Sequence, residues 1–388
     1  MLKNFFNSQK VLDEAHNLKK NRELSKAIEV LEEAINKTND IRIINLLANC
    51  LLDIGNYQRI ADLTQINSTN PRIYAIASSL ANRNISGIEP ICLNQPPLQK
   101  AAFITMVKDE EDIILFNLIW HYSLGFRKFF IIDNLSQDKT VERIHLFAKQ
   151  YDDAEVFVLH DPIIAHYQGK KVTGACRFIM SLWSDLEWLA LVDGDEFLYP
   201  SKPIDEILSS TEKNTQAIIV PKSIYSLVTG DLTNDDDFFY KRIQNRKPLS
   251  HISNKVIMRA SLQFDVSQGN HRLLDDNGKE IKNYHYSNNL SFREFPIRSH
   301  NQYLNKIING GQAVSKAKQA GFNEVGGSHW EAVYNLYLKE GEIGLRKHLD
   351  NIIRKKTTDA CIADPFPIDK ILNSMDPKNK AVLFDTNH

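Results

Sequence analysis

Hydrophobic positions follow two different patterns in two successive parts of this chain. Up to about residue 95, leucine, isoleucine and alanine recur every three or four residues, which is the spacing of amphipathic helices. From residue 101 onward, short apolar runs alternate with amphipathic stretches. Pro96 and Pro97 fall between the two patterns and mark a linker. The sequence therefore predicts an all-helical region over residues 1–95 and a domain of a different class after it.

The alternating pattern predicts a parallel β-sheet. Its apolar runs are too short for ordinary helices and indicate buried strands. Strands that alternate with helices are typical of parallel sheets built by right-handed crossovers, so we expect an α/β fold with a Rossmann-like, mostly parallel sheet. From residue 290 the tail is predicted to be mostly helical. The predicted strands cover residues 102–107, 128–133, 155–159 and 188–192, with strand-like runs at 217–220 and 255–258, and the predicted helices cover residues 112–124, 140–151 and 171–183.

The N-terminal helical region carries a faint internal repeat. Ala15 and Leu18 are matched 33 residues later by Ala48 and Leu51. This period resembles that of tetratricopeptide helix pairs, so the region is expected to be tetratricopeptide-like and to contact a protein partner or a membrane surface. The alternative is a plain helical cap that packs on the next domain.

Composition excludes several classes of protein. The chain has 388 residues, of which 47 are basic and 48 acidic, so its formal net charge is −1. A chain this balanced lacks the broad positive field of a nucleic-acid-binding protein. Its four cysteines are far apart in the sequence and indicate reduced thiols rather than disulfides or a zinc site. Neither a signal peptide nor a run of ~20 apolar residues is present, so we expect a cytoplasmic protein, with peripheral contact at the inner face of the membrane still allowed.

Carboxylates gather where the predicted strands end. The strand that ends at residue 192 is followed at once by Asp193, Gly194 and Asp195. In an open α/β sheet, ligands bind outside the carboxyl ends of the strands. Two aspartates that flank a glycine can reach one hard cation together, which would keep coordination positions open for a substrate diphosphate. The motif therefore favours a site for Mn²⁺ or Mg²⁺, and a solvated turn is the alternative.

Four segments in a fixed order resemble one family of enzymes. They are Met106–Ile113, Trp120–Phe126, Ile131–Ser136 and Trp188–Phe197. Together they resemble the family-2-like glycosyltransferases with a D-x-D-E-F signature, a group related to family 92. The resemblance implies a GT-A domain over residues 100–310, with residues 311–388 as a helical C-terminal extension. It also implies a nucleotide diphosphate sugar as donor, a divalent metal and inversion at the anomeric carbon.

The resemblance implies roles for individual carboxylates and amides of this sequence. Asp133 and Asn134 would contact the nucleotide base or ribose, and Asp109 would lie near the same pocket. Asp193 would touch the ribose or the metal, and Asp195 would be the main metal ligand. The glutamate that follows, at position 196, would support the turn.

Further candidates follow from the same resemblance and from the chemistry of the side chains. His285 would complete the metal shell, and Lys306 would pair with phosphate. Arg177 could reach the diphosphate, because a guanidinium group suits phosphate oxygens, although a surface arginine on an amphipathic helix is the alternative. His271 is a second candidate ligand or the acid/base, because imidazole titrates near neutral pH. Asp265 and Glu280 are the carboxylate candidates for the base, since the chain has no convincing Glu-Asp acceptor pair.

These observations favour a metal-dependent glycosyltransferase of the hexosyltransferase type, which moves a sugar from a nucleotide diphosphate sugar to a hydroxyl of a glycan or glycolipid. The alternative is a non-catalytic sugar-nucleotide-binding scaffold with helical repeats. A nucleotidyltransferase also pairs carboxylates with metal, but the acidic run Lys108–Glu111 after the first strand would repel a triphosphate.

The high Asn, Ile and Lys content indicates an AT-rich bacterial genome, so the expected setting, by analogy alone, is surface polysaccharide or lipooligosaccharide synthesis.

Overall fold

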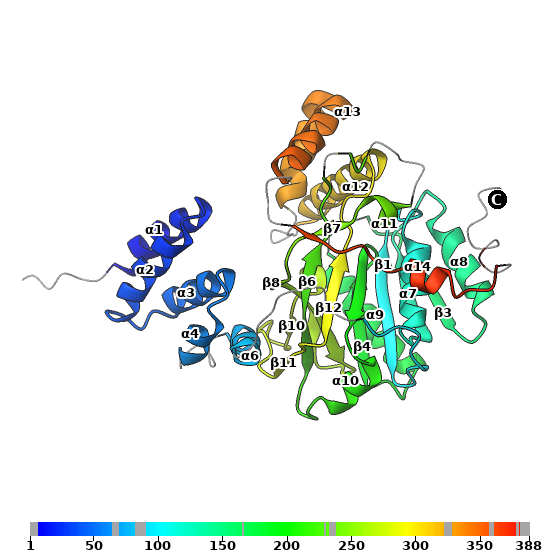
Figure 1. Cartoon of the computed structure of the whole chain (residues 1–388), viewed down its shortest axis with the longest axis horizontal. Coiled ribbons are helices and arrows are strands. Elements are labelled where there is room, and N and C mark those ends of the chain that lie inside the picture. Colours follow the sequence, from blue (N-terminus) through cyan, green and yellow to red (C-terminus); the bar gives the residue numbers. More distant parts are fainter. Residues whose placement is uncertain are drawn as a thin grey trace, which may run out of the picture.

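The computed structural model divides the chain into a helical N-terminal region and a larger α/β part (Figure 1). This arrangement confirms the predicted fold class. The structure describes residues 7–63, 70–81, 91–164, 167–228, 230–232, 238–321, 328–356, 361–377 and 380. The helices of the N-terminal region are α1 (Ser8–Lys20), α2 (Leu24–Ile35), α3 (Ile41–Asp53), α4 (Tyr57–Asp62) and α6 (Pro71–Leu80).

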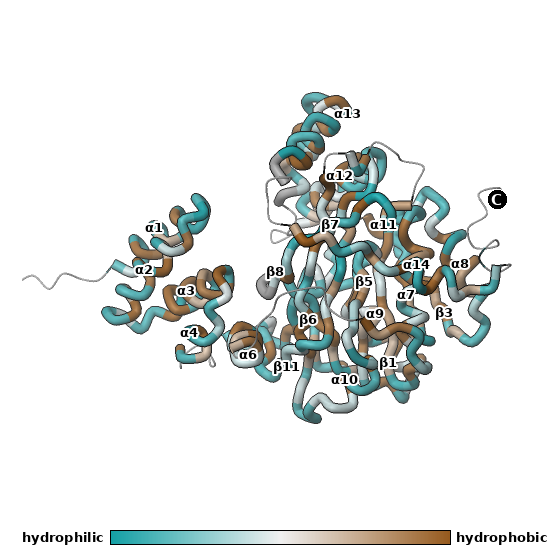
Figure 2. Tube along the Cα trace, in the orientation of Figure 1, coloured by the Kyte–Doolittle hydropathy of each residue, from teal (hydrophilic) through white to brown (hydrophobic). Residues whose placement is uncertain are grey.

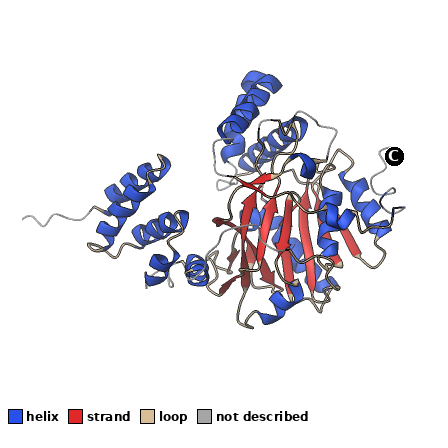
Figure 3. Ribbon diagram, in the orientation of Figure 1, coloured by secondary structure: helices blue, strands red, loops and turns tan. Residues whose placement is uncertain are grey.

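A nine-stranded sheet forms the centre of the α/β part among the described residues (Figure 3). Its strands are β1 (Ala101–Val107), β2 (Lys128–Asp133), β3 (Glu155–His160), β4 (Trp188–Asp193), β5 (Glu196–Pro200), β6 (Ala217–Ile224), β8 (Ser250–Arg259), β11 (Tyr284–Tyr286) and β12 (Leu290–Glu294). They follow the order β3-β2-β1-β4-β8-β6-β12-β5, and β11 also pairs with β6. β3, β2, β1 and β4 are parallel neighbours, and β8 is antiparallel to β4 and β6. The expected mostly parallel sheet is therefore confirmed.

Helices cover both faces of the sheet. The helices of this part are α7 (Ile114–Ser123), α8 (Thr140–Gln150), α9 (Gln168–Leu182), α10 (Ile204–Ser210), α11 (Phe239–Arg242), α12 (His300–Gln319), α13 (Ser328–Lys356) and α14 (Asp369–Leu372). Residues of α7 and α8 cluster with Phe103, Phe129 and Ile131, whereas residues of α9 cluster with Ile104 and Ile132. Successive strand residues point to opposite faces, so these wholly apolar strands need a helical layer on each side. Among the described helices, none is long and apolar enough to cross a membrane.

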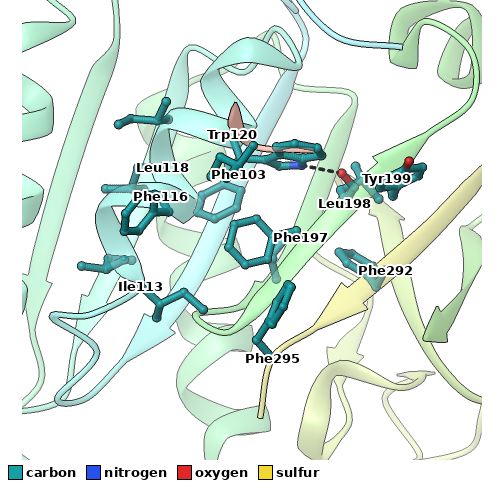
Figure 4. Packing of buried hydrophobic residues seen from close by; sticks show 14 of the residues in the cluster. Phe103, Ile113, Phe116, Leu118, Trp120, Phe197, Leu198, Tyr199, Phe292 and Phe295 are labelled. Carbon is teal, nitrogen blue, oxygen red and sulfur yellow. Dashed lines mark hydrogen bonds between the residues drawn. The ribbon is translucent and has the colours of Figure 1, made fainter. Parts of the chain in front are cut away.

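Aromatic side chains of α7 and β5 pack together in one core (Figure 4), which also includes Phe366 of the C-terminal tail. The indole N–H of Trp120 in α7 donates a hydrogen bond to the backbone O of Leu198 at 2.7 Å. The Trp120 ring also packs edge to face on Phe197, with 6.1 Å between ring centroids. Phe366 from the tail lies 4.4 Å from the Trp120 ring, measured between centroids. The described part of the tail therefore shares the core of the sheet.

The start of the tail differs from the helix predicted from residue 290. Leu290, Ser291 and Phe292 lie in β12, which inserts between β5 and β6, and all three are buried. Apolar and polar residues alternate here, and that period of two belongs to a strand rather than a helix. Helix α12 then runs across the predicted boundary between residues 310 and 311. The short strands outside the main sheet are β7 (Asn245–Arg246), β9 (Asp265–Val266), β10 (Leu273–Leu274) and β13 (Ile362–Ala363), with β13 paired to β7 and β10 to β9.

The N-terminal helices contact the sheet through α3 and α6, along which hydrophobic residues are frequent (Figure 2). Ile219 of β6 and Tyr286 of β11 belong to the same apolar cluster as the helices of this region. Arg72 Nη1 in α6 donates a hydrogen bond to Asn254 Oδ1 in β8 at 2.8 Å, and Arg72 Nε lies 3.3 Å from Glu280 Oε1. These contacts attach the helical region to the α/β part.

Candidate functional site

The carboxyl ends of β1, β2 and β4 open into one cavity of about 250 Å³. Asp109 follows β1, Asn134 follows β2, and Asp193 and Asp195 lie at the end of β4; each of the four lines the cavity. Lys306 reaches the same cavity from α12, which covers this edge of the sheet. The ends of parallel strands meet at one edge, and this is why residues so far apart in the sequence come together.

Buried polar groups hold the turn that carries the two aspartates. The Asn117 side-chain amide of α7 donates hydrogen bonds to the backbone O of Gly194 at 3.0 Å and of Glu196 at 2.7 Å. The backbone N–H of Asp193 donates to Glu196 Oε2 at 3.2 Å, so Glu196 supports the turn as expected. A Cβ at Gly194 would lie 3.1 Å from Val107 Cγ1 in β1. Glycine therefore allows the turn to approach the neighbouring strand closely.

Asp193 is bound by three side chains from three different elements. It accepts hydrogen bonds from Lys255 Nζ, from Gln168 Nε2 at 2.8 Å and from Asn270 Nδ2 at 3.1 Å. Burial would raise the pKa of Asp193, but the charges of Lys255 and Lys222 and the hydrogen bond from Lys255 together outweigh burial and lower that pKa. Asp193 is therefore ionised at neutral pH and held in one orientation.

Asp195 is paired with a lysine of the covering helix. Lys306 Nζ donates hydrogen bonds to Asp195 Oδ2 at 2.6 Å and to Pro296 O at 3.2 Å. Burial alone would raise the pKa of Asp195, but the charges of Lys306 and Arg298 outweigh burial and lower it to about 2. The cavity therefore contains two ionised carboxylates, whose hard oxygen atoms suit a divalent cation.

The charged side chains around the two aspartates carry an excess of negative charge. Their ion pairs join Asp193 and Glu196 to Lys255, Glu196 and Glu294 to Lys222, Asp195 to Lys306, and Glu110 and Asp112 to Arg298. Six carboxylates thus face four cations in this network, a formal charge of −2. Burial raises the pKa of both Glu110 and Glu196 to about 7 despite their cationic partners, so each is about half protonated at neutral pH and the network then carries about −1. A divalent cation would offset this charge, so the donor set fits one.

A metal in this cavity would need ligands from outside the protein. Among the described residues, no group of three or more His, Cys, Asp or Glu side chains is placed to hold a metal ion. Asp193 and Asp195 would then supply the protein ligands, and diphosphate oxygens and water would fill the remaining positions. Mg²⁺ in phosphate-binding enzymes is commonly held in this way, by one or two carboxylates plus the substrate.

The residues expected to contact the nucleotide are only partly at the cavity. Asp109 Oδ1 accepts a hydrogen bond from the backbone N–H of Gln137, and Asp109 Oδ2 accepts one from Asn309 Nδ2, both at 2.7 Å. Asn134 also lines the cavity, and its side-chain amide donates hydrogen bonds to Asp161 and Ile163 in the loop after β3. Asp133 is buried and accepts a hydrogen bond from the backbone N–H of Ser136 at 3.1 Å, outside the set of residues that line the cavity. Asp133 therefore shapes the loop after β2.

His285 is not close to the aspartates. It pairs in register with Ile218, near the amino end of β6, and lines a separate hollow beside Lys202 and Glu206. The cavity lies at the carboxyl ends of the parallel strands, whereas this hollow lies toward the opposite edge. The structure therefore corrects the expected role of His285 as a metal ligand beside Asp195.

Arg177 and Asp265 pair with each other outside the cavity. Arg177 Nη2 donates to Asp265 Oδ1 at 2.7 Å, and Lys170 Nζ lies 3.2 Å from Asp265 Oδ2. Gln168, at the start of α9, reaches Asp193, but Arg177 lies about 13 Å further along that helix. Neither Arg177 nor Asp265 lines the cavity, so the structure corrects the expected diphosphate contact of Arg177 and argues against Asp265 as the base.

His271, the other predicted acid/base, lies beside Asp193 and Lys255 at a second cavity of about 770 Å³. Its Nδ1 lies 2.6 Å from the backbone O of Asn254. A carbonyl oxygen only accepts hydrogen bonds, so Nδ1 carries the proton and Nε2 is the nitrogen that can take one up. Burial, together with the charge of Lys255, lowers the pKa of His271 to about 4, so the imidazole is neutral at pH 7.

Several site residues escaped the sequence analysis. Lys255 begins the strand-like run 255–258, Lys222 lies two residues after the run 217–220, and both are buried. A lysine inside a buried strand is rarely left unpaired, and this signal could have pointed to an ion-pair cluster. Glu294 and Asn270 carried no such signal, because only the path of the chain brings them to Asp193 and Lys222.

No protein family model matches this chain, and no curated protein matches it. Among solved structures, the mannosyltransferase PcManGT from Pyrobaculum calidifontis, in complex with GDP-Man and Mn²⁺, is similar over 84% of this chain and 96% of its own, at 14% identity and a TM-score of 0.32. HddC from Yersinia pseudotuberculosis is similar over 53% of this chain and 97% of its own, at 8% identity and a TM-score of 0.32. Likenesses this weak do not identify the function of this chain.

Proposed function

We propose that this chain is a metal-dependent glycosyltransferase of the family-2-like group, which moves a sugar from a nucleotide diphosphate sugar to an acceptor hydroxyl with inversion. The observation that carries the proposal is the pair Asp193 and Asp195, ionised, fixed by buried partners and facing a cavity at the ends of parallel strands. The formal charge of −2 in their ion-pair network supports a divalent cation as the third component. Surface polysaccharide or lipooligosaccharide synthesis remains the proposed setting.

The proposal gives each side of the cavity a task. Asp193 and Asp195 would hold the cation, and Asp109 and Asn134 would contact the nucleoside. A bound divalent cation would stabilise the negative charge that develops on the departing diphosphate. Lys306 contacts Asp195 now and would be free to turn to a phosphate oxygen once a cation takes over that carboxylate.

The proton acceptor in this scheme is His271. Its Nε2 would take the proton of the acceptor hydroxyl as the oxygen attacks the anomeric carbon. His271 lies in the second cavity, which borders the first at Asp193, so acceptor and donor could approach from different sides. The alternative base at this border is the carboxylate of Glu294, which lines both cavities.

A thermal-shift screen tests donor binding. Common nucleoside diphosphate sugars would be added to the full chain with and without Mn²⁺. A ligand at a hundredfold excess over its Kd stabilises the native state by about 2.7 kcal/mol, so at least one donor should raise the melting temperature by several degrees, and only with Mn²⁺. The variant Asp195→Asn should lose this shift, whereas Asp276→Asn, in an exposed loop, should keep it. No shift with any donor would speak against the proposal.

A further inference from the structure

The second cavity is larger than the first and adjoins it. It encloses about 770 Å³, within the usual size range of small-molecule sites. The two cavities share a wall that consists of Gln168, Asp193, Glu294, Lys306 and Trp330. If a sugar nucleotide occupied the first cavity, its reacting carbon would have to meet an acceptor at this wall.

The lining of the second cavity changes character from one end to the other. Near the shared wall it presents charged and polar side chains, among them Asp193, Lys255 and His271. The other end lies between α12 and α13 and is mostly apolar, although Tyr303 and His348 also line it, with the Tyr303 hydroxyl oxygen 2.8 Å from His348 Nδ1. Its lining there includes Ile297, Ile307, Val333 and Ile352. A further small hollow behind Ile297 and Ile352 is lined by Tyr225, Leu227 and Ile353, so the apolar character continues inward.

We propose that this cavity binds an acceptor whose sugar hydroxyl is carried on an alkyl or aryl group. The inference rests on the proposed function and names the substrate class of the same site. The hydroxyl would lie at the shared wall and the apolar group between α12 and α13. A free sugar would leave its own hydroxyl groups unpaired against the isoleucine and valine side chains, which costs free energy, whereas an apolar group gains by leaving water there.

The charge at the polar end favours a neutral head group. Lys222, Lys255 and Lys306 each contact a carboxylate of the ion-pair network. Lys222 and Lys255 are therefore not available to a phosphate of the acceptor without breaking a buried ion pair, and Lys306 is already assigned to the diphosphate of the donor. A neutral glycoside fits this end better than a phosphate-linked lipid.

The transfer step follows from this placement. The acceptor O–H attacks the anomeric carbon of the donor sugar, a new carbon–oxygen bond forms, and the bond from that carbon to the diphosphate breaks. The proton of the hydroxyl passes to His271 Nε2, and the nucleoside diphosphate leaves with the bonding electron pair.

Calorimetry with two glucosides that differ only in the apolar group tests the inference. n-Octyl β-D-glucopyranoside, below its micellar concentration, and methyl β-D-glucopyranoside would be titrated into the full chain. Burial of even part of the octyl chain should make the octyl glucoside bind at least about tenfold more tightly. The variant Ile352→Asp should abolish this preference, whereas Ile343→Asp, on the same helix but 69% exposed, should retain it.

Equal binding of the two glucosides, or an octyl preference that survives Ile352→Asp, would overturn the inference. If Ile352→Asp does not fold, Val333→Thr and Ile352→Thr together replace it, because threonine keeps much of the volume while adding a hydroxyl. Titration of UDP and GDP with Mn²⁺ separates the two proposals. Tight nucleotide binding without an octyl preference removes only the inference on the acceptor, whereas absent nucleotide binding removes the proposed function and the inference with it.

Discussion

At the scale of single residues, this site depends on charges that are buried in pairs. Lys255 is 1% exposed at its side chain and contacts both Asp193 and Glu196. Taking such charges out of water is costly, and each is tolerated only because the others are present. A change at one member should therefore cost more than the loss of one contact, because it leaves the partner carboxylates buried with less positive charge.

The variant Lys255→Met tests how far the stability of the chain depends on this buried ion-pair network. Removal of one partner of a buried ion pair typically costs about 3–5 kcal/mol, and the free energy of unfolding should fall by that order. Adding Glu196→Gln should restore part of the loss, because it removes one of the carboxylates left behind. The matched control is Lys202→Met, whose exposed pair with Glu206 should contribute less than about 1 kcal/mol. Denaturant unfolding measures all four proteins, and equal losses at positions 255 and 202 would disprove the argument.

The pKa of His271 predicts how stability depends on pH. Burial lowers this pKa to about 4 in the folded chain, from an ordinary value of 6.5. Between these two values the unfolded chain binds a proton that the folded chain does not bind, so stability is lost as pH falls from about 6.5 to about 4. The variant His271→Gln should show a shallower loss over that window, by up to about 1.4 kcal/mol per pH unit. Unfolding curves at several pH values decide it, and an unchanged slope would show that His271 is not neutral in the folded chain.

The two candidates for the base can be separated by kinetics. His271→Ala should lower kcat by about a hundredfold and leave the Mn²⁺ dependence unchanged, because the imidazole acts on the acceptor proton. Glu294→Gln should have a smaller effect if the carboxylate only balances Lys222. If Glu294→Gln has the larger effect on kcat, Glu294 is the base and His271 shapes the cavity.

At the scale of elements, regular strands were predictable, and elements whose partners are distant in sequence were not. Residues 128–133 form β2 as predicted, because a wholly apolar run bounded by polar turns admits few alternatives. The strand end with Asp193 and Asp195 was equally clear. β12 was missed, although its residues alternate between apolar and polar, because the helical pattern of α12 follows within a few residues and was extended back to residue 290. His285 was placed beside a metal because its pairing with β6, which is distant in sequence, cannot be inferred locally; its register on β6 puts it at the other edge.

The attachment of α6 leads to a prediction for the N-terminal region. Arg72 binds Asn254, the residue whose backbone carbonyl accepts the His271 hydrogen bond and which precedes Lys255. Arg72→Met should therefore lower kcat as well as the melting temperature. Arg59→Met breaks an ion pair with Glu32 wholly within the helical region and serves as the control.

If these helices only recruit a partner, Arg72→Met and Arg59→Met should have the same effect on kcat. Neither variant should then change the hydrolysis of donor in the absence of an acceptor. Steady-state kinetics of donor hydrolysis, with melting curves of the same samples, distinguishes the two roles. A tetratricopeptide-like recruitment role remains a proposal for the surfaces of α1 to α4.

At the scale of the whole molecule, the chain is nearly neutral, but its charges are unevenly placed. The formal net charge is −1, yet the ion-pair network at the strand ends sets six carboxylates against only four cations. The mostly parallel sheet, the covering helix α12 and the two adjoining cavities all meet at this one negative position. The central claim is that a divalent cation and a sugar nucleotide bind there and react.

The most direct test is the release of nucleoside diphosphate from a panel of nucleotide sugars, measured with wild-type protein in Mn²⁺, with wild-type protein in chelator, and with Asp195→Asn in Mn²⁺. The account predicts release by the wild type in Mn²⁺ with at least one donor, and a loss of about a hundredfold or more in the other two samples. Undiminished release in chelator or by Asp195→Asn, or no release from any donor although one of them binds, would contradict it.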